Sequence, residues 1–474
     1  MDFLNSLVGT LNNYLWSYIL IGLLIALGLF FTVRSGFAQG RLIGDMVSLI
    51  TGRLSSLKDG EKKLAGQVTG FQAFCIAVAS HVGTGNLAGI AIAISIGGPG
   101  AVFWMWLIAL LGGATSLVEN TLAQVYKVKN EDGSFRGGPS YYMEKALGMK
   151  KLGALFSVIV IVTFAIIFNT VQANTITSAL QGSFGLSLYI GGAIVTALTA
   201  AVIFGGTERI ANVSAVIVPV MAVAYILVAI IVLVLNITEL PRLFIHIIEN
   251  AFGIKQAVGG GLGVVILQGV KRGLYSNEAG MGSAPNAAAI SNVSHPVKQG
   301  LLQAFGVFVD TIIVCSATAF IVLLYPDYQE AYSQGFEGIK LTQMALAHSV
   351  GTWGIHFVTL CIFLFAFSSV IGNYYYGEAN LSYISKNKSS LFIFRVFVLV
   401  AVYIGSVAKL GTVWNMADLF MGIMALINIL VITLLSPIAI SVIKDYIKQR
   451  KEGKNPVFRA KDIPNLKNTE CWDD

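Results

Sequence analysis

Charged residues are scarce in this chain, and hydrophobic residues are abundant. Only 12% of its 474 residues are Asp, Glu, Lys or Arg, whereas 55% are hydrophobic. About one-quarter of the residues in a soluble globular domain are charged, so the composition excludes that class. A membrane-spanning helix needs roughly 20 mostly apolar residues, and about eleven stretches meet this requirement. They are 13–33, 68–97, 101–125, 152–180, 187–204, 212–236, 256–294, 300–325, 342–371, 391–408 and 416–442.

We therefore expect an all-α integral membrane protein that spans a lipid bilayer. In this interpretation residues 1–445 form one transmembrane domain, and residues 446–474 form a polar, mobile cytoplasmic tail. The first apolar stretch is too long for the core of a signal peptide, so we interpret it as a retained helix. The polar segment 127–151 contains Gly137-Gly138-Pro139, which predicts a turn followed by a helix start.

The chain also lacks the usual patterns of catalysis and cofactor binding. Its four cysteines show no metal-ligand spacing, and three of them lie in apolar stretches as ordinary core residues do. No glycine-rich loop ends in Lys-Ser or Lys-Thr, which disfavours an ATP-driven pump. No Ser/His/Asp arrangement is visible either. We expect no enzyme activity and no resident cofactor.

The net charge of +7 is explained by the distribution of Lys and Arg. If the apolar stretches cross a membrane in turn, one side receives most of the 31 Lys and Arg residues. The other side receives Arg242, Lys255, Lys340 and Lys409. Because positively charged loops stay cytoplasmic, we expect the C-terminus inside and the N-terminus outside. Nucleic acid is not needed to explain the charge. The outer segment 237–255 alternates apolar and polar residues and predicts an interfacial helix.

Two of the apolar stretches are interrupted by glycine and short polar residues. The first break reads Ser-His-Val-Gly-Thr-Gly-Asn over 80–86, and the second reads Tyr-Ser-Asn-Glu-Ala-Gly-Met-Gly over 275–282. Broken helices are tolerated in a membrane only where they are buried in protein or line a water-filled cavity. With the first span set aside, ten spans divide as five plus five, and each half opens with a break. This arrangement predicts an inverted-topology repeat around a transporter binding site.

The first break has the chemistry of a zwitterion site. Gly83 and Gly85 carry no side chain, so their backbone can approach a ligand closely. The half-helix that starts there offers free N–H groups to a carboxylate, and the half-helix that ends there offers carbonyls to a cation. A glycine packing notch between helices is the structural alternative. His81 is most simply a satisfied core histidine.

The second break is less simple, because Lys271 and Arg272 precede it and charge in mid-membrane is costly. Either the break lies toward the cytoplasmic side, or these cations face water or pair with a carboxylate such as Glu278. A glycine cluster at 259–263 is an alternative hinge. We favour Tyr275–Gly280 as the segment that lines the cavity.

Further polar residues within the apolar stretches allow two interpretations each. Ser368 and Ser369 either bond back to their own helix or complete an oxygen site for a hard cation such as sodium. Gln172 either bonds between helices or contacts the substrate, and it shares a helix face with Asn169, which Asn174 does not. Four carboxylates either relay protons or pair with Arg209, Lys271 or Arg272. They are Glu119, Asp310, Glu378 and Asp418.

Three motifs resemble the alanine or glycine:cation symporter family. They are Gly-Thr-Gly-Asn-Leu-Ala-Gly at 83–89, Gly-Gly-Pro-Ser-Tyr-Tyr at 137–142 and Ser-Asn-Glu-Ala-Gly-Met-Gly-Ser-Ala-Pro at 276–285. The resemblance runs from about residue 10 to residue 445 of this sequence. It implies a leucine-transporter-type fold with a 5+5 inverted repeat and one extra N-terminal helix. It also implies sodium-driven uptake of small neutral amino acids across the cell membrane, with sodium as co-substrate.

The resemblance also implies the residues of the two binding sites. Thr84, Gly85 and Asn86 would hold the substrate carboxylate together with Gln172, and Tyr275, Ser276 and Asn277 would line the pocket. The sodium ligands would be the carbonyls of Ala79 and Val82 and the hydroxyls of Ser368 and Ser369.

One position departs from the family pattern. By this resemblance, family members that take alanine and glycine often have Trp at the position of Asn373 in this chain. A smaller, polar side chain would widen the pocket and offer an amide, so our hypothesis is a larger polar substrate such as glutamine. The rival functions are a proton-coupled amino acid symporter, with the coupling at Glu119, Glu278 or His81, and an amino acid channel with unsaturated flux.

Overall fold

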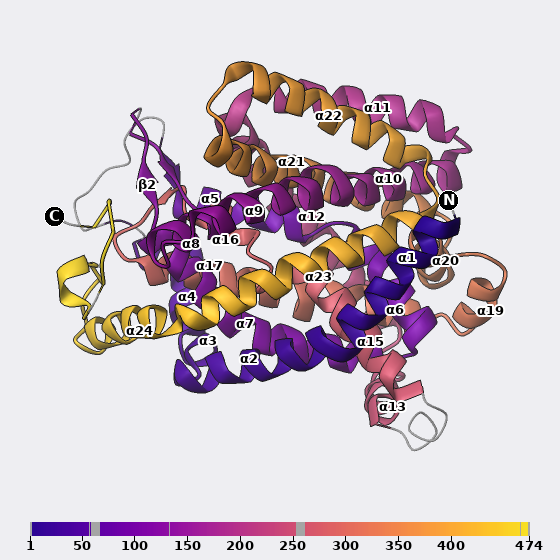
Figure 1. Ribbon diagram of the computed structural model, residues 1–474. Helices are drawn as coiled ribbons and strands as arrows, with labels where there is room; N and C mark the ends of the chain where they lie inside the picture. The colour runs from indigo at the N-terminus through magenta and orange to yellow at the C-terminus, as the bar shows by residue number, and fades with distance from the viewer. Residues whose placement is uncertain are drawn as a thin grey trace.

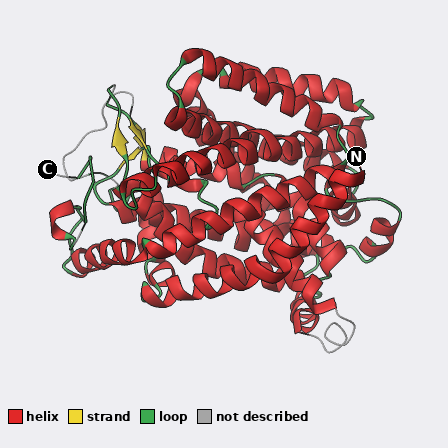
Figure 2. Ribbon diagram, viewed as in Figure 1, coloured by secondary structure: helices red, strands yellow, loops and turns green. Residues whose placement is uncertain are grey.

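The computed structural model describes residues 2–55, 57, 67–131, 133–252, 261–464 and 466–472; the side chains of 2–5, 207, 208 and 211 are not described. Helices make up most of the described residues (Figure 2). The strands are two short pairs. β1 (Val68–Thr69) pairs in parallel with β4 (Ser291–Asn292), and β2 (Val128–Lys129) pairs antiparallel with β3 (Phe135–Arg136). The expected all-α membrane protein is confirmed at this level.

Eight helical segments in the described part of the chain are long and apolar enough to cross a membrane. They are Ser6–Arg34, Ala101–Val125, Lys150–Phe184, Asn212–Leu235, Pro296–Leu323, Trp353–Ile384, Lys388–Val407 and Leu410–Leu434. The pair Gly70–His81 and Gly85–Gly97, bent by 45°, makes up to nine. The expected span 187–204 is a shorter apolar helix, Leu188–Ile203. The count of eleven stays a prediction.

Several of these spans are composite, because π-helical turns join successive α-helices. The first half of the chain contains α1 (Asp2–Asn13), η1 (Tyr14–Leu20), α2 (Ile21–Arg34), α3 (Ala38–Arg41), α4 (Ile43–Ile50), α5 (Gly70–His81), η2 (Gly85–Gly89), α6 (Ile90–Gly97), α7 (Ala101–Val125), α8 (Pro139–Lys145), α9 (Lys150–Val160), η3 (Ile161–Phe168), α10 (Asn169–Phe184), α11 (Leu188–Ile203), α12 (Gly206–Leu235) and α13 (Leu240–Phe252). The helix starts expected at Pro139 and within 237–255 are confirmed by α8 and α13.

The second half contains α15 (Gly261–Asn277), α16 (Ala284–Ala288), α17 (Pro296–Val307), η4 (Phe308–Cys315), α18 (Ser316–Leu323), α19 (Tyr328–Ser333), α20 (Ile339–Val350), α21 (Trp353–Ile384), α22 (Lys388–Val407), α23 (Leu410–Leu434), α24 (Ser436–Lys451) and η5 (Ala460–Asp462). The expected span 342–371 is wrong in its bounds. Gly351, with φ +90°, separates α20 from α21, because a residue in this conformation cannot continue a helix.

The expected span 416–442 is also wrong in its bounds. α23 ends at Leu434, and Pro437 stands in the first turn of the next helix, α24. A proline is tolerated in a first turn but cannot sit inside a continuous helix. Composition alone did not separate the two helices, because both are apolar where they meet.

The first break is confirmed between α5 and η2. Thr69 caps the start of α5 in a reciprocal hydrogen-bond pair with Gln72, and Val82 leaves the helix with φ −79° and ψ 92°. The second break lies between α15 and α16. Glu278, Gly280 and Gly282 have φ of 55°, 90° and 80°, so the chain turns repeatedly through a conformation that helices exclude. Of the alternative hinge, Gly259 and Gly260 lie outside the described residues.

The residues on either side of each break are buried among neighbouring helices. α5 packs against α12, α17 and α21, and α15 packs against α6 and α7. α7 and α17 pack against each other along their length. α11 and α22 lie side by side at one edge (Figure 1). Each break is therefore surrounded by protein, as the hydrogen-bonding needs of an interrupted helix demand.

The expectation of a mobile tail is wrong for the described residues after α24. The amide of Phe458 donates to Ser294 O at 2.9 Å, and Trp472 Nε1 donates to Gln124 O at 2.8 Å. The ammonium of Lys127 lies 4.7 Å from the Trp472 ring centroid. Figure 1 shows this segment beside β2. Phe458 and Trp472 are both buried, so two aromatic side chains fasten a segment that is otherwise charged.

Candidate functional site

The N–H groups at the first break are bound by side chains. The amide of Gly83 donates to Asn86 Oδ1 at 2.8 Å, and the amide of Thr84 donates to Gln172 Oε1 at 3.0 Å. The Thr84 hydroxyl donates to the same oxygen. The amide oxygen of Gln172 thus occupies the place that an acceptor such as a carboxylate oxygen would take at a helix start.

The other amides of α10 have structural partners. Asn174 Nδ2 donates to the carbonyls of Gly405 and Ala408 at 3.1 and 2.7 Å, which ties α10 to the end of α22. Asn169 Nδ2 donates to Ala165 O in its own helix. Of the three amides that the sequence singled out, Gln172 is the one placed at the break.

The four residues of the expected sodium site converge from α5 and α21. The Ser368 hydroxyl lies 3.4 Å from Ala79 O, and the Ser369 hydroxyl lies 3.4 Å from Val82 O. Both hydroxyls also donate to Phe365 O, at 2.8 and 3.0 Å, so the back-bonding alternative is realised at the same time. All four residues are buried.

The carbonyls at the end of α5 have lost their helical partners. In a continuous helix the amide of Gly83 would donate to Ala79 O, but here it donates to Asn86 Oδ1. Val82 is extended, so its carbonyl points out of the helical ladder. The result is a cluster of two backbone oxygens and two hydroxyl oxygens, which is the ligand chemistry of a hard cation.

The two breaks contact each other through Tyr275. A Cβ atom on Gly85 would lie 2.9 Å from Tyr275 Cδ1 and 3.2 Å from Ser276 Cα, so the glycine permits this approach. The Tyr275 ring lies 4.7 Å from both Phe168 and Trp414, between η3 and α23. Its buried hydroxyl has no hydrogen-bond partner among the described residues.

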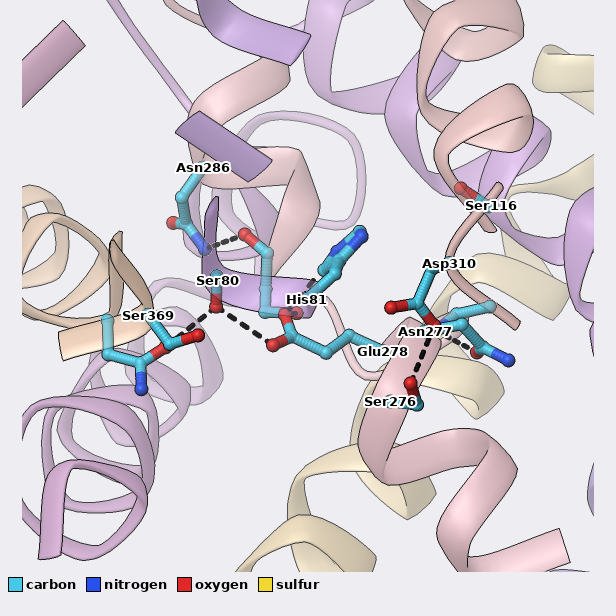
Figure 3. Close-up of polar contacts among 12 residues, drawn as sticks. Ser80, His81, Ser116, Ser276, Asn277, Glu278, Asn286, Asp310 and Ser369 are labelled. Atoms are coloured by element: carbon cyan, nitrogen blue, oxygen red, sulfur yellow. Dashed lines mark hydrogen bonds and ion pairs between the residues drawn. The ribbon is translucent and has the colours of Figure 1, made fainter. Parts of the chain in front are cut away.

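Asp310 of η4 connects the breaks through hydrogen bonds. Its carboxylate accepts from Asn86 Nδ2 at 2.6 Å. It also accepts from the Ser276 hydroxyl at 2.7 Å (Figure 3). The sequence marked Asp310 as an intramembrane carboxylate without indicating these partners. Asn277 instead donates to Thr311 Oγ1 at 3.1 Å and accepts from the amide of Ala279, so it closes the end of α15.

Asn373 lies on α21, one turn beyond Ser369, and faces the end of α5. Its Oδ1 lies 2.7 Å from Ser80 Oγ, and its Nδ2 is buried without a partner among the described residues. The Ser80 hydroxyl also lies 2.8 Å from Glu278 Oε1 (Figure 3). Ser80 therefore links Asn373 to the second break, a connection that the sequence did not reveal.

The two glutamates at the second break have different environments. Glu119 of α7 accepts from the backbone amides of Gly280 and Gly282 at 2.9 and 3.1 Å, and from Asn428 Nδ2 at 2.8 Å. Glu278 accepts from the hydroxyls of Ser80 and Ser283, and its Oε2 lies 3.6 Å from His81 Nε2. The backbone N–H groups of the positive-φ segment therefore bind the Glu119 carboxylate, in the way that concave arrays of backbone N–H groups bind anions.

The cations before the second break do not pair with Glu278. Arg272 Nη2 lies 2.6 Å from Asp418 Oδ2 on α23, and Lys271 Nζ lies 3.4 Å from the same oxygen. The guanidinium of Arg272 also lies over the Trp414 ring, 4.5 Å from its centroid. Glu378 lies 3.9 Å from Arg395. The pairing alternative therefore holds for Asp418, whose position on another helix no local pattern predicts.

Comparisons with known proteins agree with this geometry. Residues 1–460 match the model of the sodium:alanine symporter family. The chain is 52% identical to amino-acid carrier protein AlsT of Bacillus subtilis over 474 residues, which cover 100% of this chain and 98% of the relative. It is 49% identical to the probable sodium/glutamine symporter GlnT of the same species over 470 residues, which cover 99% and 96%.

A more distant relative is the sodium/alanine symporter AgcS of Methanococcus maripaludis. It is 38% identical to this chain over 460 residues, which cover 96% of this chain and 100% of the relative. The match to the family model and the matches to these relatives both extend over nearly the whole chain. The chain is a multi-pass membrane protein that belongs to the sodium:alanine symporter family.

Proposed function

We propose that this protein is a sodium-coupled symporter that imports a small neutral amino acid by alternating access. The observation that carries the proposal is the surroundings of Gly83. A Cβ atom on Gly83 would lie 2.2 Å from Ser369 Oγ, on the sodium side, and 2.9 Å from Gln172 Oε1, on the substrate side. One short backbone segment therefore contacts both candidate sites, so an ion and a substrate that bind there must affect each other.

Sodium, as co-substrate, fits the oxygens of Ala79, Val82, Ser368 and Ser369. Each hydroxyl can turn its lone pairs toward the ion, because its proton already has an acceptor in Phe365 O. A bound cation would hold the end of α5 against α21. It would thereby fix the geometry of the amides at 83 and 84, with which the substrate interacts.

The substrate carboxylate would take over the donors that Gln172 Oε1 now occupies. The amide and hydroxyl of Thr84 converge on that oxygen, and a carboxylate is the stronger acceptor for such donors. The rest of the wall of the proposed substrate pocket is formed by Gly85, Asn86, Tyr275 and Ser276. Asn277 supports this wall from behind through its contacts with Thr311 and Ala279.

The names of the relatives support a neutral amino acid as the substrate, since GlnT is described as a glutamine symporter and AgcS as an alanine symporter. We propose glutamine as a substrate of this chain, because Asn373 offers an unpaired Nδ2 close to Ser80. Replacement of Asn373 by Trp should lower glutamine uptake relative to alanine uptake. An unchanged ratio of the two rates would defeat this assignment.

The arrangement of the helices supports a 5+5 repeat after the N-terminal helix. The first broken helix, α5, packs on α17 of the second half, and α15 packs on α7 of the first half, while α7 and α17 pack on each other. Two inverted repeats that pack against each other produce such a reciprocal set of contacts. We place the protein in the cell membrane, with the N-terminus outside and residues 446–474 as a cytoplasmic tail.

The decisive test is uptake of radiolabelled alanine and glutamine into proteoliposomes. Symport predicts saturable accumulation against a concentration gradient when an inward sodium gradient is imposed, and none when choline replaces sodium at fixed pH. Competition by a panel of unlabelled amino acids would rank the substrates. Linear, unsaturated flux without accumulation would instead establish a channel, and accumulation that follows pH alone would establish a proton symporter.

A further inference from the structure

Glu278 carries a buried carboxyl group for which the described residues provide no fixed positive charge. Its side chain is 1% exposed, and its one ion-pair contact among the described residues is His81, at 3.6 Å. Lys271 and Arg272 are engaged with Asp418 instead. An ionised carboxylate buried without a partner costs several kcal/mol, so a group in this position binds either a proton or a cation.

Glu119, at the same break, provides the contrast. Its oxygens accept from two backbone amides and one side-chain amide, which can only donate. Such a set of donors stabilises an ionised carboxylate. The partners of Glu278 are the hydroxyls of Ser80 and Ser283, which can donate or accept. The surroundings of Glu278 are therefore compatible with both of its protonation states.

With the Asn373 amide oriented as it is here, the two short contacts of Ser80 fit the protonated state of Glu278. Ser80 Oγ lies 2.8 Å from Glu278 Oε1 and 2.7 Å from Asn373 Oδ1, and both of these atoms are acceptors when Glu278 is ionised. A hydroxyl has one proton and can serve only one of them. If Glu278 is protonated, its O–H donates to Ser80 Oγ, and the Ser80 hydroxyl donates to Asn373 Oδ1. Both of these short contacts are then proper hydrogen bonds.

We propose that Glu278 is a proton-binding site and that the Ser80 hydroxyl transmits its protonation state to the side-chain amide of Asn373. When Glu278 loses its proton to water, Ser80 turns to donate to the carboxylate. Asn373 Oδ1 would then face an oxygen lone pair at 2.7 Å. The amide relieves this contact by turning over, so that Nδ2 donates to Ser80 and Oδ1 takes the place of the free Nδ2.

The consequence for transport rests on the proposed function, in which Asn373 faces the substrate. The protein would present a hydrogen-bond donor from Asn373 when Glu278 is protonated and an acceptor when it is not. Substrates whose side chains accept hydrogen bonds but cannot donate them would therefore be favoured at low pH. A matched pair of probes is glutamine and the γ-methyl ester of glutamate, which have nearly the same length but differ in whether the side chain can donate.

Five other titratable groups lie around Glu278 and define the controls. His81 on α5 faces its carboxyl, and Glu119 on α7 and Asp310 on η4 are the neighbouring carboxylates. Tyr275 on α15 and Tyr376 on α21 are the neighbouring phenols. His81 is the group that could titrate in its place, so a His81→Gln variant separates the two.

The direct test is infrared difference spectroscopy of the purified protein between pH 5 and pH 9. The proposal predicts a carboxylic acid C=O band that is present at low pH, disappears as the pH rises, and is absent from Glu278→Gln at every pH. The band should persist in His81→Gln and in Ser80→Ala. A band that is unchanged in Glu278→Gln would overturn the assignment, and size-exclusion profiles would verify that each variant is folded.

The second test measures sodium-driven uptake of the two probes in proteoliposomes at the same pH values, with alanine as the reference. The ester-to-glutamine ratio should fall by about 2- to 10-fold as the pH rises, the range of one neutral hydrogen bond. Glu278→Gln should hold the ratio at its low-pH value, and Ser80→Ala should make it independent of pH while the infrared band remains. Glu378→Gln should behave like the unmodified protein.

A ratio that still changes with pH in both Glu278→Gln and Ser80→Ala would overturn the link to Asn373. Failure of the proposed function gives a different result. In that case the unmodified protein would not accumulate alanine under a sodium gradient at any pH, whereas the infrared band would still report on Glu278.

Discussion

Replacement of Gly83 by alanine tests whether one backbone segment serves both binding sites. The added methyl group would lie 2.2 Å from Ser369 Oγ and 2.9 Å from Gln172 Oε1, whereas ordinary contacts are 3.4–4 Å. Because both distances are shorter than a real Cβ contact, the Ser369 hydroxyl must rotate away from Val82 O, and Gln172 and α10 must shift away from Thr84. The first response removes a sodium ligand, and the second distorts the substrate donors.

Overpacking of this kind costs about 1–3 kcal/mol, which corresponds to a roughly 5- to 150-fold loss of affinity. We therefore expect Gly83→Ala to weaken both the sodium dependence and the substrate affinity of uptake by a factor in this range. The matched control is Gly22→Ala, because a Cβ on Gly22 meets nothing within 4 Å. Gly85→Ala should weaken substrate binding more than sodium binding, since its Cβ would meet Tyr275 and not Ser369.

Titrations of uptake against sodium and against substrate, in the same proteoliposomes, would measure both constants. The reasoning is refuted if Gly83→Ala is folded and shows sodium and substrate constants equal to those of Gly22→Ala. It is also refuted if only one of the two constants changes, because the two sites would then be independent.

Three further predictions concern contacts outside the binding sites. Asp418→Asn leaves Lys271 and Arg272 buried without a full negative charge and should destabilise the protein by about 3–5 kcal/mol, seen as a lower unfolding temperature in detergent; equal stability would show that the ion pair lies in water. Burial lowers the pKa of His295, so below about pH 6.5 the unfolded chain binds a proton that the folded protein does not. Stability should therefore fall from pH 7 to pH 5, and by less in His295→Gln. Trp472→Ala removes the hydrogen bond to Gln124 and the contact with Lys127, and limited proteolysis should then cut the tail after α24 faster; an unchanged rate would mean that Trp472 does not fasten the tail.

Both helix breaks could be predicted from the sequence, because glycine and short polar residues interrupt an apolar stretch in a membrane only where protein or water surrounds them. The choice of Gln172 as a substrate contact came from the resemblance to the symporter family. Helix geometry alone gave only that Gln172 shares a face with Asn169 and that Asn174 does not. These are local signals, and residues within one or two turns carry them.

Contacts between distant helices were not predictable in this way. Ser80 and Asn373 are separated by 293 residues, and Asn86 and Asp310 by 224. Which carboxylate pairs with Lys271 and Arg272 depends on how α23 packs beside α15, and Asp418 offers no local sign of it. The prediction of a mobile tail fails for a related reason. The tail is rich in charged residues, and the partners that hold Phe458 and Trp472 lie more than 100 residues away in the sequence.

The central claim is that one interrupted helix binds the ion and the amino acid together. Isothermal titration of the purified protein with alanine and with glutamine, in sodium and in choline, tests it most directly. The account predicts at least about fivefold tighter binding in sodium, and by linkage an equal gain in sodium affinity when the amino acid is present. Equal affinities in the two salts would contradict it.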